Sequence, residues 1–396
     1  MAPLKNVLLV CFLFFASHAG IAQSIQVKGI IKDIITNEVL SHVTVSTENQ
    51  EHSTISNDEG AFAFTCPADT RKIILSSIGY NDFALSLTDL PKDGIFFLEE
   101  KSIELEEIIV INIPVHEFID KLIKTSYDKL NAPFLLSTYY REFVRVNDQY
   151  TKFSDALIDY NVEKKKKEVE SQVVVKQSRA VKLDVENAEE IDMTSPLDLR
   201  KAVSRDCNFS VLKKVFTKKE SKKYSFVLKS QAGKDGQVTE AIYFEPLETI
   251  EEPLYEGSIV YDPQKNLIVS VDLHMANSHK KYSKLRNFII VKARLDDIAY
   301  KSLYKITNDS YMLSYSMVGG NVYLKNKKKY DDNIIFKSDM IVTNFSKDLS
   351  SFNKKEKYTD KGLYQRGTKF TDKFWLNNNS ILLTAEEEEI IKSIAN

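Results

Sequence analysis

Histidine spacing is the first place to look for chemistry in this 396-residue chain. Beyond residue 22, the histidines are His42, His52, His116, His274 and His279. His116-Glu117 begins the H-E-x-x-H pattern of zinc proteases, but Asp120 stands where the second histidine belongs. We therefore predict a surface pair on the first turn of a helix. His274 and His279 have no cysteine or carboxylate pair at ligand spacing, so we predict exposed loop histidines.

Serine and carboxylate chemistry also lacks a local signature. Neither G-x-S-x-G nor a glycine-rich phosphate loop occurs. S-x-x-K occurs without a companion K-T-G, at Ser210, Ser278, Ser302 and Ser351. Paired carboxylates carry no short motif, and we expect solvated side chains at Asp155 and Asp159, Glu245 and Glu248, and Asp296 and Asp297. The sequence therefore predicts no catalytic residue, cofactor or metal ligand, and favours a protein that is not an enzyme.

Composition limits the class of protein. The 54 basic and 56 acidic side chains leave a formal charge of −2, which argues against a nucleic-acid partner. Hydrophobic residues make up 43% of the chain, including 22 Phe and 19 Tyr, enough to bury a sizeable core. With 3 Cys, 12 Gly and 9 Pro, the chain is neither a disulfide scaffold nor collagen-like.

Residues 1–22 have the pattern of a secretory signal peptide. Lys5 precedes an apolar run and a small-x-small site, which predicts cleavage after Ala22. The run is short for a membrane anchor, and Val10 before Cys11 is too large for a lipidation site. No later stretch is long and apolar enough to span a membrane, so we expect an extracytoplasmic protein, in the periplasm or associated with the outer membrane.

Two cysteines follow the predicted cleavage site. Cys66 and Cys207 could pair in an oxidising compartment. They lie far apart in sequence and in different predicted domains, so we favour two small buried side chains over a disulfide.

Residues 24–98 read as about seven short strands with turn residues between them. Two alternating runs flank Asp58-Glu59-Gly60, which predicts a β-hairpin with Gly60 at positive φ. Phe62 and Phe64 fall on one face of the second strand and are expected in the core. With no helical period in this region, the pattern predicts a small antiparallel β-sandwich.

Four motifs in this region fall in order: V-K-G-I-I-K-D, S-N-D-E-G-A-F-A-F, S-S-I-G-Y and L-E-E-I-I-V. Together they resemble the carboxypeptidase-regulatory-like β-sandwich over residues 23–111, which implies a transthyretin-type fold common in Gram-negative envelope proteins. The same module begins many TonB-dependent outer-membrane receptors. The remaining chain lacks the plug and barrel of such a receptor, and no carboxypeptidase zinc ligands precede the module.

Residues 112–396 predict a β-rich domain. An amphipathic pattern predicts a helix over 115–130, long alternating strands follow, and a capping box at Thr384 predicts a C-terminal helix over 385–395. A hairpin turn is expected at Gly319-Gly320-Asn321 and a short helix from Ser195-Pro196. The run E-G-S-I-V-Y-D-P-Q-K-N-L-I-V-S-V-D is similar to the half-barrel of periplasmic lipoprotein carriers. Tyr140–Ala156 resembles envelope proteins that join such a sandwich to a β-rich domain.

These patterns predict a mainly β chain: a small sandwich, then an α+β domain with a large curved antiparallel sheet and a packed helix. The favoured function is an exported, non-enzymatic envelope protein that binds a lipid, a glycan or another envelope protein, or has a structural role. Two alternatives stay open: a hydrolase without a local signature, and an accessory of a TonB-dependent transport system.

Overall fold

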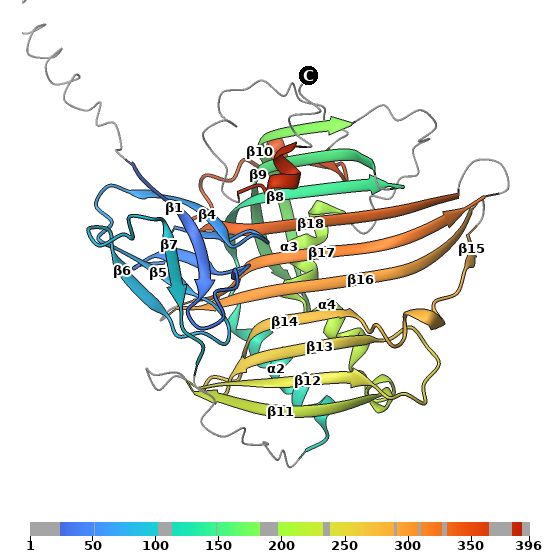
Figure 1. The fold of residues 1–396 in the computed structure, drawn as a ribbon. Helices are drawn as coiled ribbons and strands as arrows, with labels where there is room; N and C mark the ends of the chain where they lie inside the picture. The colour runs from blue at the N-terminus through green and yellow to red at the C-terminus, as the bar shows by residue number, and fades with distance from the viewer. Residues whose placement is uncertain are drawn as a thin grey trace, which may run out of the picture.

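The computed structural model describes the chain in several stretches. They are residues 24–50, 52–101, 113–147, 149–182, 197–232, 238–288, 291–307, 310–326, 331–363 and 382–389. A small sandwich occupies the first part, and one large antiparallel sheet occupies most of the rest (Figure 1). The mainly β fold class predicted from the alternating patterns is confirmed.

The sandwich consists of a three-stranded sheet, β4-β1-β7, and a four-stranded sheet, β3-β2-β5-β6. Its strands are β1 (Ser24–Asp33), β2 (Thr44–Thr47), β3 (Ser53–Ile55), β4 (Ala61–Pro67), β5 (Lys72–Ser76), β6 (Phe83–Ser86) and β7 (Ile95–Leu98). Phe62 and Phe64 are buried in its core, as predicted. The prediction of a wholly antiparallel sandwich is wrong, because β7 returns to pair with β1 in parallel.

The turn from β3 to β4 has the conformation that the sequence predicts. Gly60 has φ +73°, and a Cβ there would lie 2.7 Å from the carbonyl oxygen of Ile31. The side chain of Asn57 accepts a hydrogen bond from the backbone N–H of Glu59, at 3.0 Å. This turn holds Asp58 and Glu59 at one end of the sandwich, where they reach the rest of the chain.

The large sheet has eleven strands. They are β8 (Phe134–Val146), β9 (Gln149–Lys165), β10 (Glu168–Lys182), β11 (Tyr224–Ala232), β12 (Val238–Pro246), β13 (Tyr255–Asp262), β14 (Leu267–Met275), β15 (Arg286–Phe288), β16 (Val291–Ile306), β17 (Tyr311–Lys325) and β18 (Asp331–Ser346). The order is β10-β9-β8-β18-β17-β16-β14-β13-β12-β11, with β15 paired to β16. Strands β10 and β11 end this path, so the described part forms an open sheet.

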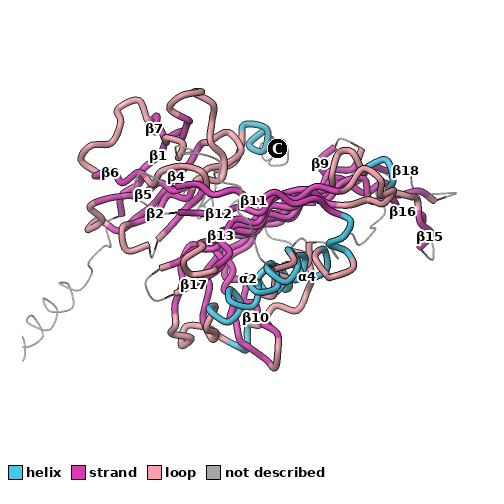
Figure 2. The backbone as a smooth tube through the Cα atoms, turned by 90° about the horizontal axis from the view of Figure 1, so that it is seen from below, coloured by secondary structure: helices cyan, strands magenta, loops and turns pink. Residues whose placement is uncertain are grey.

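Helices α2, α3 and α4 lie on one face of this sheet, and the sandwich lies on the other (Figure 2). The helices are α2 (Val115–Lys129), α3 (Leu199–Cys207) and α4 (Ser210–Val215), with short 3₁₀ turns η1 (Glu220–Lys223), η2 (Lys280–Tyr282) and η3 (Lys354–Glu356). We call the two sides of the large sheet the helix face and the polar face. Helix and strand side chains on the helix face form the largest buried apolar cluster described.

Helix α2 packs on the sheet as the amphipathic pattern predicts. Leu122 is fully buried, and the Phe118 ring meets the edge of Tyr261 at 5.5 Å between ring centroids. The Ser126 hydroxyl accepts a hydrogen bond from the backbone N–H of Ile268 in β14, at 2.9 Å. The helix ends at Lys129, one residue before the predicted end.

The predicted turn at Gly319-Gly320-Asn321 is wrong, because β17 runs straight through it. A Cβ on Gly320 would lie 2.7 Å from the ring of Phe336 and 2.8 Å from the carbonyl oxygen of Asp297. The glycine therefore permits close packing against its neighbours within a continuous strand.

Other predicted boundaries are met in part. The start predicted at Ser195-Pro196 lies outside the described residues, and α3 is capped instead by Asp198, which accepts from the N–H of Arg200. Residues 385–389 are helical, whereas 390–396 lie outside the described residues. So do the predicted signal peptide with its cleavage site at Ala22 and the L-E-E-I-I-V segment.

The division into residues 23–111 and 112–396 stays a prediction. None of the helices in the described part of the chain combines the length and apolar character that crossing a bilayer requires.

Candidate functional site

A row of side chains crosses the polar face of the large sheet. Directly opposed residues on neighbouring strands from β10 to β14 are Arg179, Asp155, Arg141, Asp339, Met317, Lys301 and Asp272. Opposed residues project from the same face of a sheet. Basic and acidic groups therefore alternate along this line, interrupted once by a methionine. We call it the charge row.

Arg141 is the centre of the buried half of the charge row, with 3% of its surface exposed. Its Nη2 lies 3.2 Å from Oδ2 of Asp339, and its Nη1 lies 2.9 Å from Oε2 of Glu387. Burial lowers the pKa of Arg141, but the two facing carboxylates more than offset this effect, so the net pKa is raised. The guanidinium thus stays charged and joins Asp339 of β18 to Glu387, which lies 246 residues after Arg141 in the sequence.

Asp155 extends the buried cluster toward β10. Arg179 donates to both of its carboxylate oxygens, each at 2.7 Å, and the Tyr139 hydroxyl donates at 2.8 Å. Such bidentate pairs are among the stronger ionic contacts in proteins. Burial raises the pKa of Asp155, and the bonds from Arg179 oppose that rise.

The sandwich docks on the polar face through apolar and ionic contacts together. Ile55 of β3 is buried in a cluster with side chains of the large sheet, namely Tyr139, Leu303, Tyr315 and Ile341. Beside this cluster, Nζ of Lys337 lies 2.7 Å from Oδ2 of Asp58. The pKa of Asp58 is lowered: burial would raise it, but Lys337 more than offsets burial. The sandwich is therefore fixed to the large sheet by a small core with an ion pair at its edge.

His42 lies in the same interface. Its ring meets the edge of Tyr315 at 5.2 Å between centroids, and its Nε2 lies 3.8 Å from Oδ1 of Asp58. Burial, with the nearby charge of Lys301, lowers the pKa of His42 to about 4. The imidazole is thus neutral at neutral pH.

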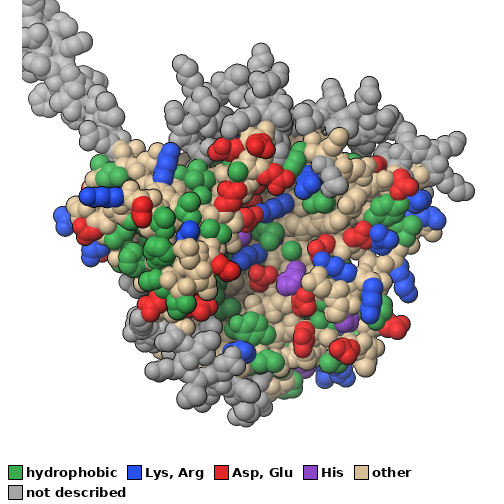
Figure 3. Space-filling model, in the orientation of Figure 1, with side chains coloured by type: hydrophobic (Ala, Val, Ile, Leu, Met, Phe, Trp, Pro, Cys, Tyr) green, Lys and Arg blue, Asp and Glu red, His purple; other side chains and the backbone are tan. Residues whose placement is uncertain are grey.

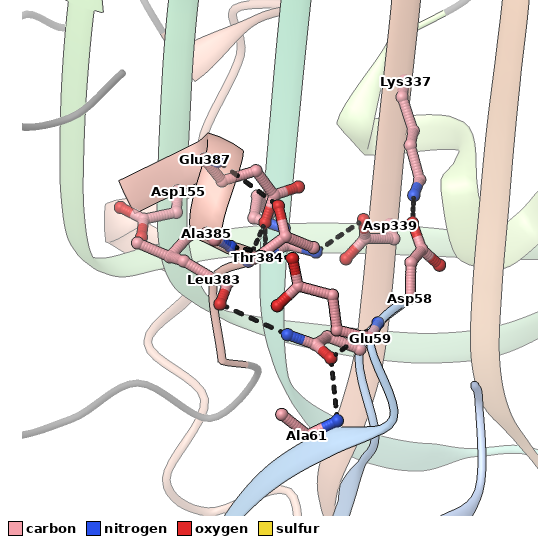
Figure 4. Close-up of polar contacts among 12 residues, drawn as sticks. Asp58, Glu59, Ala61, Asp155, Lys337, Asp339, Leu383, Thr384, Ala385 and Glu387 are labelled. Atoms are coloured by element: carbon pink, nitrogen blue, oxygen red, sulfur yellow. Dashed lines mark hydrogen bonds and ion pairs between the residues drawn. The ribbon is translucent and has the colours of Figure 1, made fainter. Parts of the chain in front are cut away.

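A C-terminal segment, residues 382–389, lies where the sandwich meets the polar face around Arg141 (Figure 4). We call this meeting place the Arg141 junction, or the junction. The predicted capping box is present: the Thr384 N–H donates to Oε2 of Glu387 at 2.9 Å, and the Glu387 N–H donates to Oγ1 of Thr384 at 3.2 Å. Asn57 of the sandwich donates to the carbonyl of Leu383 at 3.2 Å, and Glu59 accepts from the N–H of Ala385 at 3.0 Å. The segment therefore touches both the sandwich and the large sheet.

A small pocket opens where these parts meet. It has an empty volume of about 220 Å³, open to solvent, and is lined by His42, Ile55, Ser56, Asn57, Asp58, Arg141, Tyr315, Lys337 and Asp339. Two buried polar atoms, Nε of Arg141 and Oδ1 of Asp339, have no hydrogen-bond partner within the described structure. Buried polar atoms in proteins are normally hydrogen-bonded, so both atoms have unused hydrogen-bonding capacity.

The remainder of the polar face, over β16 to β11, is more open. Lys301 lies 3.6 Å from Asp272, and His274 lies 3.1 Å from Glu256. Figure 3 shows acidic, basic and histidine side chains intermixed on this side of the molecule, with a hollow beside the sandwich. Within the described ranges, no group of three His, Cys, Asp or Glu side chains could hold a metal ion.

The predicted histidine sites fall in different places. His116 and Glu117 lie on the first turn of α2, 3.9 Å apart, as predicted. The prediction of two exposed loop histidines is wrong for both: His274 is half-exposed but lies in strand β14, and His279 is buried. The His279 ring packs against Tyr282, and Nδ1 lies 2.8 Å from the Ser278 hydroxyl.

The expectation of solvated carboxylate pairs has different outcomes at different positions. Glu245 and Glu248 are exposed, as expected. Asp155 and Asp159 project from the same side of β9, but both are buried in ion pairs, so the expectation of solvated side chains is wrong there. Asp297 pairs with Lys280 at 2.8 Å.

Two further predictions concern cysteine and S-x-x-K. Cys66 and Cys207 are free and buried in separate apolar clusters, which supports the reading of two small core side chains. Ser302 is buried, whereas Nζ of Lys305 reaches the carbonyl of Gln50 in the sandwich. The S-x-x-K match at Ser302 therefore reflects strand packing.

Sequence reasoning missed Arg141, Asp339 and Glu387 as a set. One signal was available in β8, Phe134–Val146, where large apolar residues occupy both alternating positions and so indicate a strand covered on both faces. A charge inside such a strand must be buried and needs a partner. The identity of that partner, more than 190 residues away, has no local signal.

One family model matches this chain. Residues 27–110 match the CarboxypepD_reg-like domain, which supports the resemblance for the N-terminal part. The match covers the sandwich and does not extend over the large sheet. Among curated proteins, no relative matches.

Two solved structures are similar to part of the chain. A LolA superfamily protein from Nitrosomonas europaea is 9% identical, with a TM-score of 0.21, and covers 56% of this chain and 92% of its own. A DUF1329 family protein from Desulfovibrio piger is 7% identical, with a TM-score of 0.20, and covers 59% of this chain and 92% of its own.

Proposed function

We propose that this chain is an exported, non-enzymatic protein of the cell envelope whose role is binding or structural. The observation that carries this proposal is that the basic side chains of the junction are paired with carboxylates. Arg141, Lys337 and Arg179 each form an ion pair with a carboxylate. The Lys337 pair joins the sandwich to the large sheet, the pair of Arg141 with Glu387 joins the C-terminal segment to it, and the Arg179 pair joins two of its strands. Charged side chains that are held in such ion pairs join parts of a chain and are not placed to transfer protons.

The compartment is part of the same proposal. The CarboxypepD_reg-like match and the signal-like residues 1–22 support a place outside the cytoplasm, in the periplasm or at the outer membrane. A protein, a glycan or a lipid of the envelope would then be the partner. The polar face favours a ligand with charged or hydrogen-bonding groups, because its exposed part carries acidic, basic and histidine side chains.

A hydrolase is the second candidate function. The observation that favours it is the small pocket described above. His42, Asp58 and Asp339 line one small space, and the pKa of His42 is shifted. Against this reading, the His42 ring lies edge-on to Tyr315, and the Asp58 carboxylate is bound to Lys337. A general base needs its acceptor atom free to reach a substrate.

The test uses the full chain expressed in a Gram-negative host. We expect the protein in the envelope fractions with Gln23 as its first residue, and no turnover of chromogenic ester, phosphoester, glycoside or peptide substrates. An uncleaved protein that stays in the cytoplasm would contradict the export proposal. Turnover that is lost in His42→Gln, but kept in the control His52→Gln outside the pocket, would establish the hydrolase instead.

A further inference from the structure

The C-terminal segment, residues 382–389, contacts the junction in the manner of a bound peptide. Glu387 inserts its carboxylate against Arg141, and the Tyr150 hydroxyl donates to Glu386 at 3.3 Å. Within 385–389, Glu387 is the buried residue, with 7% of its surface exposed, and its neighbours are exposed. One acidic side chain therefore anchors the segment.

The other contacts bind backbone atoms. Asn57 donates to the carbonyl of residue 383, and Glu59 accepts from the N–H of residue 385. Neither contact depends on which side chain the segment carries at those positions. The sandwich thus recognises the start of a helix, and the large sheet recognises a glutamate at its third position.

Three ion pairs of the receiving surface form without the segment. Arg141 pairs with Asp339, Arg179 with Asp155, and Lys337 with Asp58. Glu387 adds a further carboxylate, and its pKa is raised because burial outweighs the effect of Arg141. Arg141 also has a buried Nε without a hydrogen-bond partner, beside the pocket. These ion pairs therefore do not include the segment, and Arg141 keeps one unused hydrogen-bond donor.

We propose that the Arg141 junction is a binding site for acidic peptides that begin a helix with a Thr-x-x-Glu capping box. In this structure the chain's own residues 382–389 occupy it and are displaceable by such a peptide from a partner protein. The proposal rests on the binding role argued above and names the class of partner. A segment of the same chain competes for the site at a higher local concentration than a free peptide does, so weak contacts are enough to keep the site occupied.

The test compares two full-length variants of equal charge change. Glu387→Lys places a cation against Arg141 and should expel the segment, whereas Glu389→Lys, at an exposed position, should leave it bound. Hydrogen exchange of residues 382–389 reports the release: we expect at least tenfold faster exchange in Glu387→Lys only. Unchanged protection in Glu387→Lys would overturn the proposal, because the segment would then not be displaceable.

Binding is measured with a fluorescent synthetic peptide of residues 382–389. We expect the Glu387→Lys chain to bind it at least tenfold more tightly than the wild-type and Glu389→Lys chains, whose sites are occupied. The same peptide with Glu387→Gln should bind the Glu387→Lys chain at least tenfold more weakly. Equal affinity for both peptides would mean a general charge effect and would overturn the proposal, as would the absence of binding. Either result leaves the export and substrate tests above unaffected, so the two failures are distinguishable.

Discussion

The two faces of the large sheet are covered by different means. On the helix face, α2, α3 and α4 bury one continuous apolar cluster, in which any residue of suitable shape contributes. On the polar face, the sandwich and the C-terminal segment are held by a small apolar cluster and by specific ion pairs. Apolar burial stabilises a contact without requiring a particular orientation of the side chains. A buried charge is stabilised only when a group of opposite charge lies in the right place. Under the binding role proposed above, the helix face serves folding and the polar face serves recognition.

Two buried carboxylates of neighbouring strands, Glu142 and Asp339, show the same difference between the two faces. Glu142 lies on the helix-face side of β8, where the Tyr140 hydroxyl donates to it at 2.9 Å. Burial raises the pKa of Glu142 to about 7. On the polar face, Asp339 faces Arg141 directly. A buried carboxylate whose partner is a tyrosine hydroxyl thus has a raised pKa, whereas Asp339 in the charge row is matched by a cation.

The largest effect is expected for Arg141→Met. Removal of the cation leaves the carboxylates of Asp339 and Glu387 buried without compensation, and breaking a buried pair in this way costs about 3–5 kcal/mol. Denaturant unfolding of the full chain measures the loss. Lys124→Met, at an exposed partner of Asp128 in α2, is the control and should cost less than about 1 kcal/mol. Equal losses in both variants would contradict the distinction between buried and exposed charges.

Leu122→Ala tests the helix face. Leu122 is fully buried between α2 and the sheet, and truncation of such a side chain costs about 2–5 kcal/mol. The measurement is again the free energy of unfolding. The exposed neighbour Lys121→Ala should lie within about 0.5 kcal/mol of the wild type. A loss from Leu122→Ala no greater than that of the control would mean that α2 does not stabilise the sheet.

Local signals predicted most of the fold. Alternation placed the strands, and the 3.6-residue period placed α2, because each pattern reports burial of the residues that carry it. Gly319 and Gly320 misled because glycine serves both turns and close packing, and the ring of Phe336 that requires Gly320 has no local sequence mark. The junction was beyond local reasoning, since Arg141, Asp339 and Glu387 meet only after the sheet has formed.

Glu142→Gln tests the raised pKa that we assign to the helix face. The pKa of Glu142 is about 7 in the folded chain, against an ordinary value of 4.5. A raised folded pKa means that its contribution is fully present below pH 4.5 and is lost as pH rises through 7. Wild type should therefore lose stability relative to Glu142→Gln between pH 5 and 8, by on the order of 2 kcal/mol. A difference that does not change over this range would place the pKa near its ordinary value.

Gly60→Val tests the turn that carries Asp58 and Glu59 to the polar face. The φ of +73° disfavours a β-branched residue, and the new Cβ would meet the carbonyl of Ile31 at 2.7 Å. We expect a loss of about 1–3 kcal/mol in thermal or denaturant unfolding of the full chain. Gly79→Val has a similar φ of +85° in open space, so it isolates strain from collision and should cost less. An equal loss in the two variants would mean that the collision is relieved without cost.

The smallest effect is expected in the open half of the charge row, at Lys301 and Asp272. Their charged atoms lie 3.6 Å apart, with 26% and 41% of their side chains exposed, whereas Arg141 and Asp339 are almost fully buried. Water screens the exposed pair and hydrates each partner when the other is removed. A double-mutant cycle with Lys301→Ala and Asp272→Ala should give a coupling of about 0.2–1 kcal/mol that weakens as salt is raised. Salt-insensitive coupling above about 2 kcal/mol would show that burial does not divide the row, and the contrast between a recognition half and a solvated half would fail.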